Sequence, residues 1–204
     1  MGFLNEKCIF EPITEESLSK LDSFSCGNDD LDIFFRKKSI LYQDELLGKS
    51  YCFVLAEEPD TVVCAFTLSN DSLRLDKLPN SRKKKVKRFI PGAKQMKRYP
   101  AVLIGRLGIN KNYQNLHIGS DLMMFIKLWF VDPNNKTGCR FLLVDAYNIE
   151  KPLAYYERNG FEYLFHNERQ EALFFFDNES KNLDTRFMIF DLIKMKTMQI
   201  IGKP

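Results

Sequence analysis

Several features that define other protein classes are scarce or missing in this 204-residue chain. Its five cysteines are scattered and never form a Cys-x-x-Cys pair, so we expect reduced thiols, no metal site and a cytoplasmic protein. No apolar run approaches the roughly 20 residues of a membrane span. The start of the chain also lacks the basic and apolar regions of a signal peptide. We therefore expect no membrane partner.

Low-complexity linkers and internal repeats are also missing. Hydrophobic residues make up 45% of the chain, with 18 Phe and 8 Tyr, so it can bury a sizeable core and disorder is excluded. We predict a single domain over residues 1–204, with a basic loop at 77–98 and an acidic polar loop near 166–185.

Acidic residues are absent from the segment 77–98, which contains ten lysines and arginines. The rest of the chain holds twenty basic and twenty-seven acidic residues, so the net charge of +3 hides a basic segment in an acidic protein. Such a segment is typical of a nucleic-acid interface. Two other interpretations stay open: a solvated loop that only carries surface charge, and attraction of a polyanionic cofactor.

The stretch from Tyr99 to Phe161 is the most informative part of the sequence. Its nearly continuous apolar runs at 101–109 and 141–146 predict strands that are covered on both faces, as in a parallel β-α-β unit. The loop 112–119 between them opens directly onto a helix, whose unpaired N–H groups and dipole favour an anion. This arrangement predicts a phosphate-bearing cofactor.

The expected order of elements is β-α-α-β-β-β-α-β-α-β-β. Thr14 is predicted to cap one early helix and Asn28 or Asp29 the next. The fold class is therefore mixed α/β, with a largely antiparallel sheet that contains one parallel pair.

Residues Gln114–Gly119 follow the pattern Q/R-x-x-G-x-G/A, with His117 in place of the first glycine. Residues 152–161 follow A-x-x-F-Y-x-x-x-G-F. Together with the preceding strand, these segments resemble the GNAT family of acyl-CoA-dependent N-acyltransferases. The resemblance implies that the twisted sheet splays at its central parallel pair to hold acetyl-CoA.

The resemblance also implies roles for individual residues. Tyr156 would be the general acid for the leaving thiolate, and Tyr155 would pack in the core or along the pantetheine. Asn148 would lie near the cofactor. His117 is either a surface residue or a base or phosphate ligand. The residues implied to bind acetyl-CoA through the strand and loop are Leu107, Ile109, Gln114, Asn115, Leu116, His117, Ile118, Gly119 and Ser120.

The reaction implied is transfer of the acetyl group to a primary amine by direct attack. A charged amine cannot attack, so a group must accept its proton. The candidates are Asp71, Asp145, Glu150 and Glu157, and the sequence does not choose among them. A covalent route through Cys26 or Cys139 is excluded, because neither has an obvious His partner.

The acceptor stays open. Residues 24–34 resemble the F-x-C-G-x-x-x-L-x-x-F opening of toxin–antitoxin acetyltransferases, which implies aminoacyl-tRNA as acceptor and a ribbon-helix-helix antitoxin as partner. The segment 77–98 would then contact tRNA. The alternatives are an acetyltransferase for another amine, and a non-catalytic nucleic-acid-binding module with a degenerate cofactor site. A homodimer is common in the family.

Overall fold

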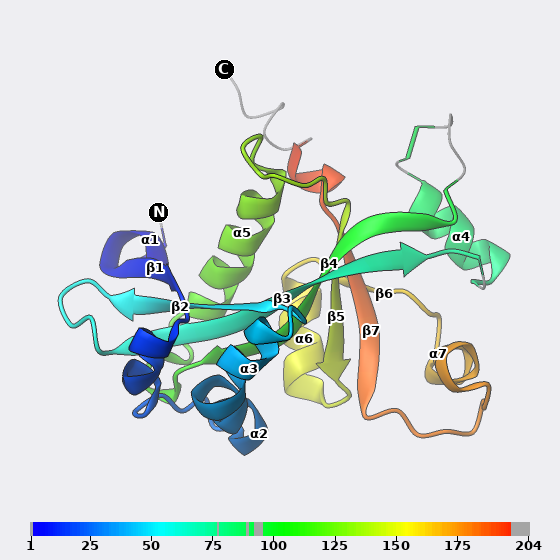
Figure 1. Ribbon diagram of the computed structural model, residues 1–204. Helices are drawn as coiled ribbons and strands as arrows, with labels where there is room; N and C mark the ends of the chain where they lie inside the picture. The colour runs from blue at the N-terminus through cyan, green and yellow to red at the C-terminus, as the bar shows by residue number, and fades with distance from the viewer. Residues whose placement is uncertain (1, 77, 89, 92–95, 197–204) are drawn as a thin grey trace. The chain divides into compact units, whose positions relative to one another are not determined.

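The computed structural model describes residues 2–76, 78–88, 90–91 and 96–196 (Figure 1). These residues form a seven-stranded mixed sheet in the order β1-β2-β3-β4-β5-β7-β6, with β4 and β5 parallel. The mixed α/β fold with one parallel pair is therefore confirmed. The splaying of that pair around acetyl-CoA stays a prediction. The strands are β1 Cys8–Pro12, β2 Lys49–Leu55, β3 Val62–Arg74, β4 Arg98–Ile109, β5 Phe141–Tyr147, β6 Glu162–Tyr163 and β7 Thr185–Asp191.

Helices connect these strands, and two of the predicted caps are present. Thr14 and Ser17 form a capping box at η1, and the Asn28 side chain accepts a hydrogen bond from the Leu31 N–H at 3.2 Å. The helical segments are α1 Phe3–Lys7, η1 Glu15–Leu21, α2 Asp29–Ile33, η2 Phe34–Lys38, α3 Ser39–Asp44, α4 Asn80–Lys87, η3 Lys111–Tyr113, α5 Ile118–Val131, α6 Glu150–Arg158 and α7 Glu168–Phe176.

The chain divides into two compact units, each built from two separate stretches of sequence. The first comprises the described residues up to 70 together with 104–126. Its strands β1 and β2 pair antiparallel, with Cys8 opposite Leu55 (Figure 1). Its core is formed by rings and aliphatic side chains from β2, β3 and the helices after β1, including Phe24, Phe35 and Val54.

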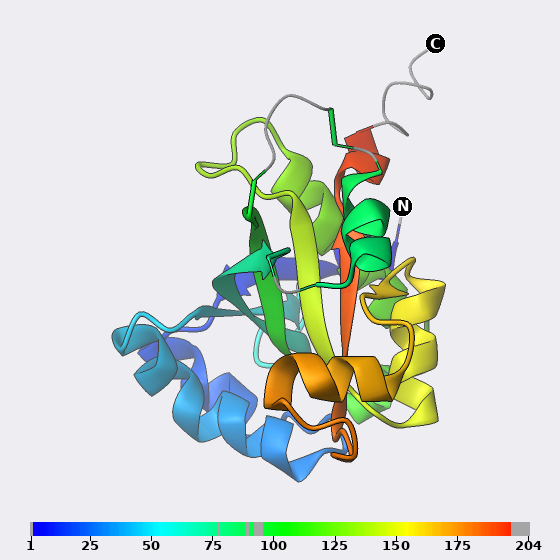
Figure 2. The same ribbon diagram turned by 90° about the vertical axis from the view of Figure 1, so that its right-hand side faces the viewer.

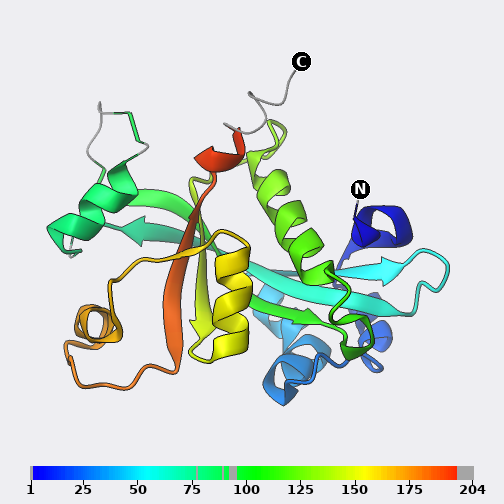
Figure 3. The ribbon, with the colours of Figure 1, turned by 180° about the vertical axis from the view of Figure 1, so that it is seen from behind.

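The second unit comprises the described residues of 71–103 and 127 onward. Strand β5 explains its core, because the run Phe141–Val144 is fully buried, as expected for a strand covered on both faces. β5 pairs parallel with β4 at Ala101–Leu103 and antiparallel with β7 along its whole length. α6 lies along β5 (Figure 3), and α7 packs beside β7 (Figure 2).

The two predicted loops each contain a helix. The expectation of a basic loop at 77–98 was wrong over α4, a helix whose Val86 is buried in the core of the second unit. The acidic polar loop near 166–185 likewise contains α7, capped by the Asn167 side chain. Lys77 and Lys94 lie outside the described residues. The single domain stays a prediction.

Candidate active site

The loop between η3 and α5 presents backbone N–H groups. Asn115 and His117 have positive φ angles of 64° and 59°, whereas Leu116 between them does not. Alternation of this kind makes successive N–H groups converge into an anion-binding concavity. Within the described residues, the N–H groups of Leu116, His117 and Ile118 donate no hydrogen bond. The loop therefore combines converging donors with the N-terminus of a 14-residue helix.

His117 occupies a position that needs a left-handed backbone, where the family pattern has glycine. Its φ of 59° lies in the region that only glycine adopts freely, and His tolerates this region better than most residues. The His117 carbonyl accepts hydrogen bonds from the Ser120 and Asp121 N–H groups at 2.9 and 3.1 Å, which begin α5. The side chain is exposed. The backbone at His117 thus keeps the glycine-like geometry without the glycine.

Three hydrogen bonds hold this loop in place. The buried Asn110 amide donates to the Val62 carbonyl at 2.9 Å. The Gln114 amide nitrogen donates to the carbonyls of Cys26 and Ile109, at 2.8 and 3.0 Å. Both Gln114 N–H groups are therefore used by the protein, so this side chain supports the loop. Asn110 was not predicted from the sequence, where a polar residue at a strand end carries no distinctive signal.

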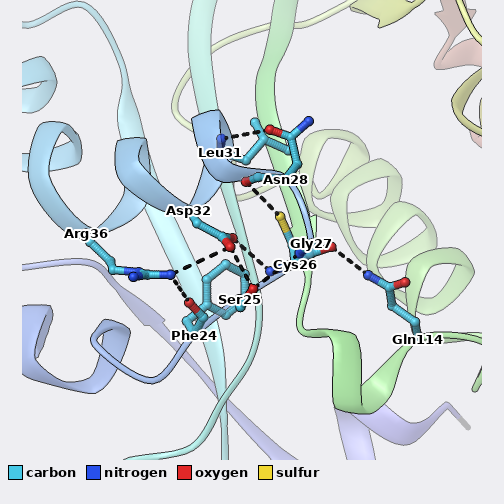
Figure 4. Close-up of polar contacts among 9 residues, drawn as sticks. All are labelled: Phe24, Ser25, Cys26, Gly27, Asn28, Leu31, Asp32, Arg36 and Gln114. Carbon is cyan, nitrogen blue, oxygen red and sulfur yellow. Dashed lines mark hydrogen bonds and ion pairs between the residues drawn. The ribbon is translucent and has the colours of Figure 1, made fainter.

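The turn after Phe24 packs against the same loop (Figure 4). The Lys111 N–H donates to the Ser25 carbonyl at 2.8 Å, beside the bond from Gln114 to Cys26. On β4, a Cβ added to Gly108 would meet the Cys26 side chain at 3.1–3.2 Å, so any larger residue would require Cys26 to shift by a few tenths of an ångström. The turn that precedes α2 therefore also supports the loop before α5.

Buried Asp32 organises that turn. It accepts hydrogen bonds from the Ser25 hydroxyl at 2.7 Å and from the Cys26 N–H at 2.8 Å, with Arg36 at 3.6 Å (Figure 4). Burial acts to raise the pKa of Asp32, but these hydrogen bonds and the charge of Arg36 outweigh it, so the pKa is lowered. Asp32 is therefore an anion that fixes the turn ahead of α2.

Tyr156 lies on α6 in the second unit. Its ring contacts those of Tyr155 and Phe161, with centroids 5.0 and 5.4 Å away. In the described residues no hydrogen bond to its hydroxyl is present, and burial raises the pKa of the phenol above its usual value of 10. Tyr156 is consequently a protonated donor at neutral pH, without a hydrogen-bond partner among the described residues.

The end of α6 is tightly bonded around Tyr156. The Tyr156 carbonyl accepts hydrogen bonds from the N–H groups of Asn159 and Phe161, at 3.1 and 3.0 Å. Gly160 has a φ of 77°, which completes the turn between them. The pattern Asn-Gly-Phe after the tyrosines therefore fixes the helical turn that carries the hydroxyl.

Asn148 was implied to lie near the cofactor. Its backbone N–H donates to the Asp184 carbonyl at 2.8 Å, and its side-chain amide donates to the Leu183 carbonyl at 2.9 Å. These bonds tie the end of β5 to the segment before β7. Of the implied cofactor residues, those from Leu107 to Ser120 belong to the first unit, and Asn148 and Tyr155 belong to the second.

Among the candidate bases, Asp145 is distinguished by its pKa. Partial desolvation by the surrounding residues, followed by the charge of Asp71, raises the pKa of its carboxyl group, although Asp145 is exposed on β5. The pKa of Glu171, which is ion-paired to Arg186 at 2.8 Å, is also raised by burial and in part by Asp145. A carboxylate with a raised pKa is a better proton acceptor at neutral pH, so Asp145 is favoured over the other candidates.

The cysteines are all free thiols. Burial raises the pKa of Cys26 to about 12 and that of Cys139 to about 11, so neither is a thiolate at neutral pH. In the described parts of the chain, no group of three or more His, Cys, Asp or Glu residues could hold a metal ion. No helix among these residues is both long and apolar enough to cross a membrane.

Neither the protein-family models nor the curated proteins contain a match to this chain. Solved structures do match. AtaT complexed with acetyl-methionyl-tRNAfMet is 20% identical, with a TM-score of 0.69 over 94% of this chain and 99% of that one. A KacT variant in which a tyrosine is replaced by phenylalanine is 20% identical, with a TM-score of 0.65 over 95% and 99%. AtaTR bound with AcCoA is 19% identical, with a TM-score of 0.64 over 95% and 99%.

The chain has the GNAT fold. The agreement extends over nearly the full length of each chain. At this level of identity the match establishes the fold and leaves the chemistry to be argued from the residues.

Proposed function

We propose that this protein is an N-acetyltransferase that moves an acetyl group from acetyl-CoA to a primary amine. The observation that carries the proposal is the loop at the start of α5. Its unpaired N–H groups at Leu116, His117 and Ile118 and its two positive φ angles fit a pyrophosphate. Two structures with the same fold support the donor, since AtaTR is bound with AcCoA and AtaT with an antitoxin peptide and acetyl-CoA.

Binding would use the backbone of the first unit. The loop residues Asn115–Ser120 would hold the pyrophosphate, and Leu107 and Ile109 on β4 would pair with the pantetheine amides. Gln114 would hold the loop in shape through its bonds to Cys26 and Ile109. Acetyl-CoA supplies an activated thioester, so the protein has to position it and move protons.

Proton transfer would use the second unit. Tyr156 would donate its phenolic proton to the leaving thiolate, because it stays protonated at neutral pH and has no partner in the described residues. Asp145 would accept the proton of the attacking amine, because its pKa is raised toward neutrality. Tyr155 would pack along the pantetheine, and Asn148 would keep the end of β5 in place.

An aminoacyl-tRNA acceptor is the second candidate. α4 carries Arg82, Lys83, Lys84, Lys85 and Lys87, which would attract a polyanion. AtaT has been solved with acetyl-methionyl-tRNAfMet, and KacTA has been solved with DNA. In this candidate the partner would be a ribbon-helix-helix antitoxin, as AtaT is bound by the C-terminus of the antitoxin AtaR. A non-catalytic nucleic-acid-binding module is the remaining alternative for the function. A homodimer remains a possible assembly for each of these functions.

A cytoplasmic location is part of the proposal. It is supported by the five free cysteines, four of which have a pKa raised to about 11 or 12 by burial and so remain thiols.

Calorimetry with acetyl-CoA tests the donor. We expect acetyl-CoA to bind and free CoA to weaken this binding by competition. Absence of acetyl-CoA binding would contradict the proposed acetyltransferase function. Labelled acetyl-CoA is then incubated separately with aminoacylated tRNA, polyamines and bulk protein. Label in the tRNA pool alone would establish the second candidate. Label in another pool would establish a different amine acceptor, and binding of tRNA without acetyl-CoA would favour the non-catalytic module.

A further inference from the structure

A buried cation lies beside the end of α6. Lys127, on α5, is only 5% exposed. Its ammonium group donates a hydrogen bond to the Asn159 carbonyl and lies 4.1 Å from the centre of the Phe190 ring. Within the described residues no carboxylate pairs with it, and the charge of Lys194, which is also positive, acts on it. Lys127 is therefore a buried charge without a counter-ion.

Such a residue is costly to keep. Burying an ammonium group without a carboxylate is strongly unfavourable, even when aromatic faces and a carbonyl oxygen offset part of the cost. Burial and the charge of Lys194 lower the pKa of Lys127 to about 8. Lys194 is itself paired with Glu162 at 2.7 Å, so it keeps its own counter-ion. A methionine of similar volume would avoid the cost of Lys127, so its charge needs another explanation.

The partner of Lys127 gives that explanation. Asn159 ends α6, and its N–H donates to the carbonyls of Tyr155 and Tyr156 at 3.2 and 3.1 Å. The Asn159 side chain donates to the Tyr155 carbonyl again, at 2.9 Å. Lys127 thus binds the residue that closes the last turn of the helix on which Tyr156 lies.

A second set of contacts connects Lys127 to the ring of Tyr156. The Lys127 ammonium also lies 5.9 Å from the centre of the Phe161 ring, and Phe161 contacts both Phe190 and Tyr156, at 5.6 and 5.4 Å. The hydrogen bond through Asn159 and the packing through Phe161 therefore start at one cation and end at Tyr156.

We propose that Lys127 is a positioning residue that fixes the Tyr156 hydroxyl by holding the C-terminal end of α6. A cation at a helix C-terminus is stabilised by the carbonyl groups there, and here the position is also shielded from water. Without the cation, the last turn of α6 loosens and the hydroxyl moves. A displacement of about 1 Å at a reacting group is enough to cost roughly 100-fold in rate. This inference rests on the acid role proposed for Tyr156.

Three variants test the proposal. Lys127→Met removes the charge and the hydrogen bond, and Lys127→Arg keeps a cation that does not titrate. Lys194→Met is the matched control, because Lys194 also lies over the Phe190 ring, at 5.7 Å, but is bound to Glu162. Each is assayed with labelled acetyl-CoA and whichever pool the wild-type protein acetylates: aminoacylated tRNA, polyamines or protein.

We expect Lys127→Met to lower kcat by about 10-fold or more while the KM for acetyl-CoA stays within about 2-fold, because the hydrogen bond and ring contacts of Lys127 lead to the end of α6. Lys127→Arg and Lys194→Met should keep most of kcat. Relative to Lys127→Arg, wild-type kcat should fall above about pH 8, where Lys127 loses its charge. The raised pKa of Tyr156 keeps it from titrating there. A kcat of Lys127→Met near the wild-type value, or identical pH profiles, would overturn the proposal.

A readout without activity separates this proposal from the proposed function. Tyrosine labelled with ¹³C at Cζ gives an NMR signal for Tyr156, assigned by its loss in Tyr156→Phe. We expect this signal to move with a midpoint near pH 8 in the wild-type protein and to stay constant in Lys127→Arg. If no pool is acetylated but the signal moves, the proposed acetyltransferase function is wrong, while Lys127 still positions Tyr156. A constant wild-type signal contradicts the positioning itself, and it does so even if Lys127→Met fails to fold.

Discussion

The loop before α5 and the end of α6 solve their proposed tasks by different means. The loop presents N–H groups of the backbone, whose direction is set by the φ angles of Asn115 and His117. The helix presents a single hydroxyl, on Tyr156, whose position is set by side chains and carbonyls around it. One region depends on conformation and the other on chemical identity.

This difference explains which departures from the family pattern are tolerated. His117 replaces a glycine, yet the backbone keeps a φ of 59°. No residue other than tyrosine would place a phenol at position 156. We therefore expect substitutions in the loop to weaken acetyl-CoA binding in proportion to how far they disturb φ or block the N–H groups. Any substitution that removes the hydroxyl of Tyr156 should lower kcat.

The largest effect is expected from Tyr156→Phe. Removing the hydroxyl leaves the ring and its packing, so kcat should fall about 100-fold while the Kd for acetyl-CoA stays within about 2-fold. Tyr155→Phe is the control, since it removes the neighbouring hydroxyl, and it should lower kcat by less than about 3-fold. Rates are measured by transfer of labelled acetyl groups. Equal losses in both variants would contradict a special role for Tyr156.

The second-largest effect is expected from a substitution that blocks the N–H groups of the loop before α5. Gly119→Val puts a branched side chain at the first turn of α5, where the N–H groups would approach phosphate, so the Kd for acetyl-CoA should rise by more than about 10-fold. Gly138→Val is the control, because a Cβ at Gly138 meets nothing within 4 Å. Calorimetry measures both. Unchanged binding in Gly119→Val would mean that phosphate lies elsewhere.

Two substitutions at His117 distinguish the contribution of its backbone conformation from that of its side chain. His117→Val should destabilise the protein by about 1–2 kcal/mol, because a β-branched residue resists positive φ, and should weaken acetyl-CoA binding several-fold. His117→Gly should keep binding and stability, since glycine adopts this φ freely. Urea unfolding and calorimetry check both. Loss of binding in His117→Gly would show instead that the imidazole is a ligand.

The smallest effect concerns acid stability of the region after α6. Glu162 pairs with Lys85 and Lys194 at 2.8 and 2.7 Å. Burial acts to raise its pKa, but the two lysines lower it from 4.5 to about 2. A lowered pKa stabilises the fold above pH 4.5 and is lost as the pH falls from 4.5 toward 2.

Because the Glu162 side chain is 44% exposed, this contribution should be less than about 1 kcal/mol. Urea unfolding of Glu162→Gln and of the wild-type protein at pH 5.5 and pH 3 measures it. The difference between the two proteins should shrink at pH 3, and a difference that grows would contradict the assignment.

Much of the fold could be predicted because its signals are local. The buried run at 141–144, the capping box at Thr14 and the Asn28 cap each depend on residues within a few positions. The loop and the tyrosines could be placed because they follow short patterns at fixed spacing. Local periodicity and short patterns thus carried the fold class and the candidate residues.

The features that could not be predicted from the sequence depend on contacts between residues far apart in the chain. Gln114 bonds Cys26 across 88 positions, and Asn110 bonds Val62 across 48, so no window of sequence contains either pair. α4 was missed because its charges hide one buried residue, Val86. Burial of Lys127 is decided by tertiary packing, which no local pattern in the sequence reveals.

The bonds from Lys111 and Gln114 to the turn at Ser25 and Cys26 have an evolutionary consequence. If the turn shapes acceptor choice and the loop holds the donor as proposed, the two share the same hydrogen bonds and cannot diversify independently. A chimaera that imports the segment 24–34 from a relative should therefore fold best with glycine at 108 and an amide at 114. New acceptors would therefore be acquired by changing both segments together.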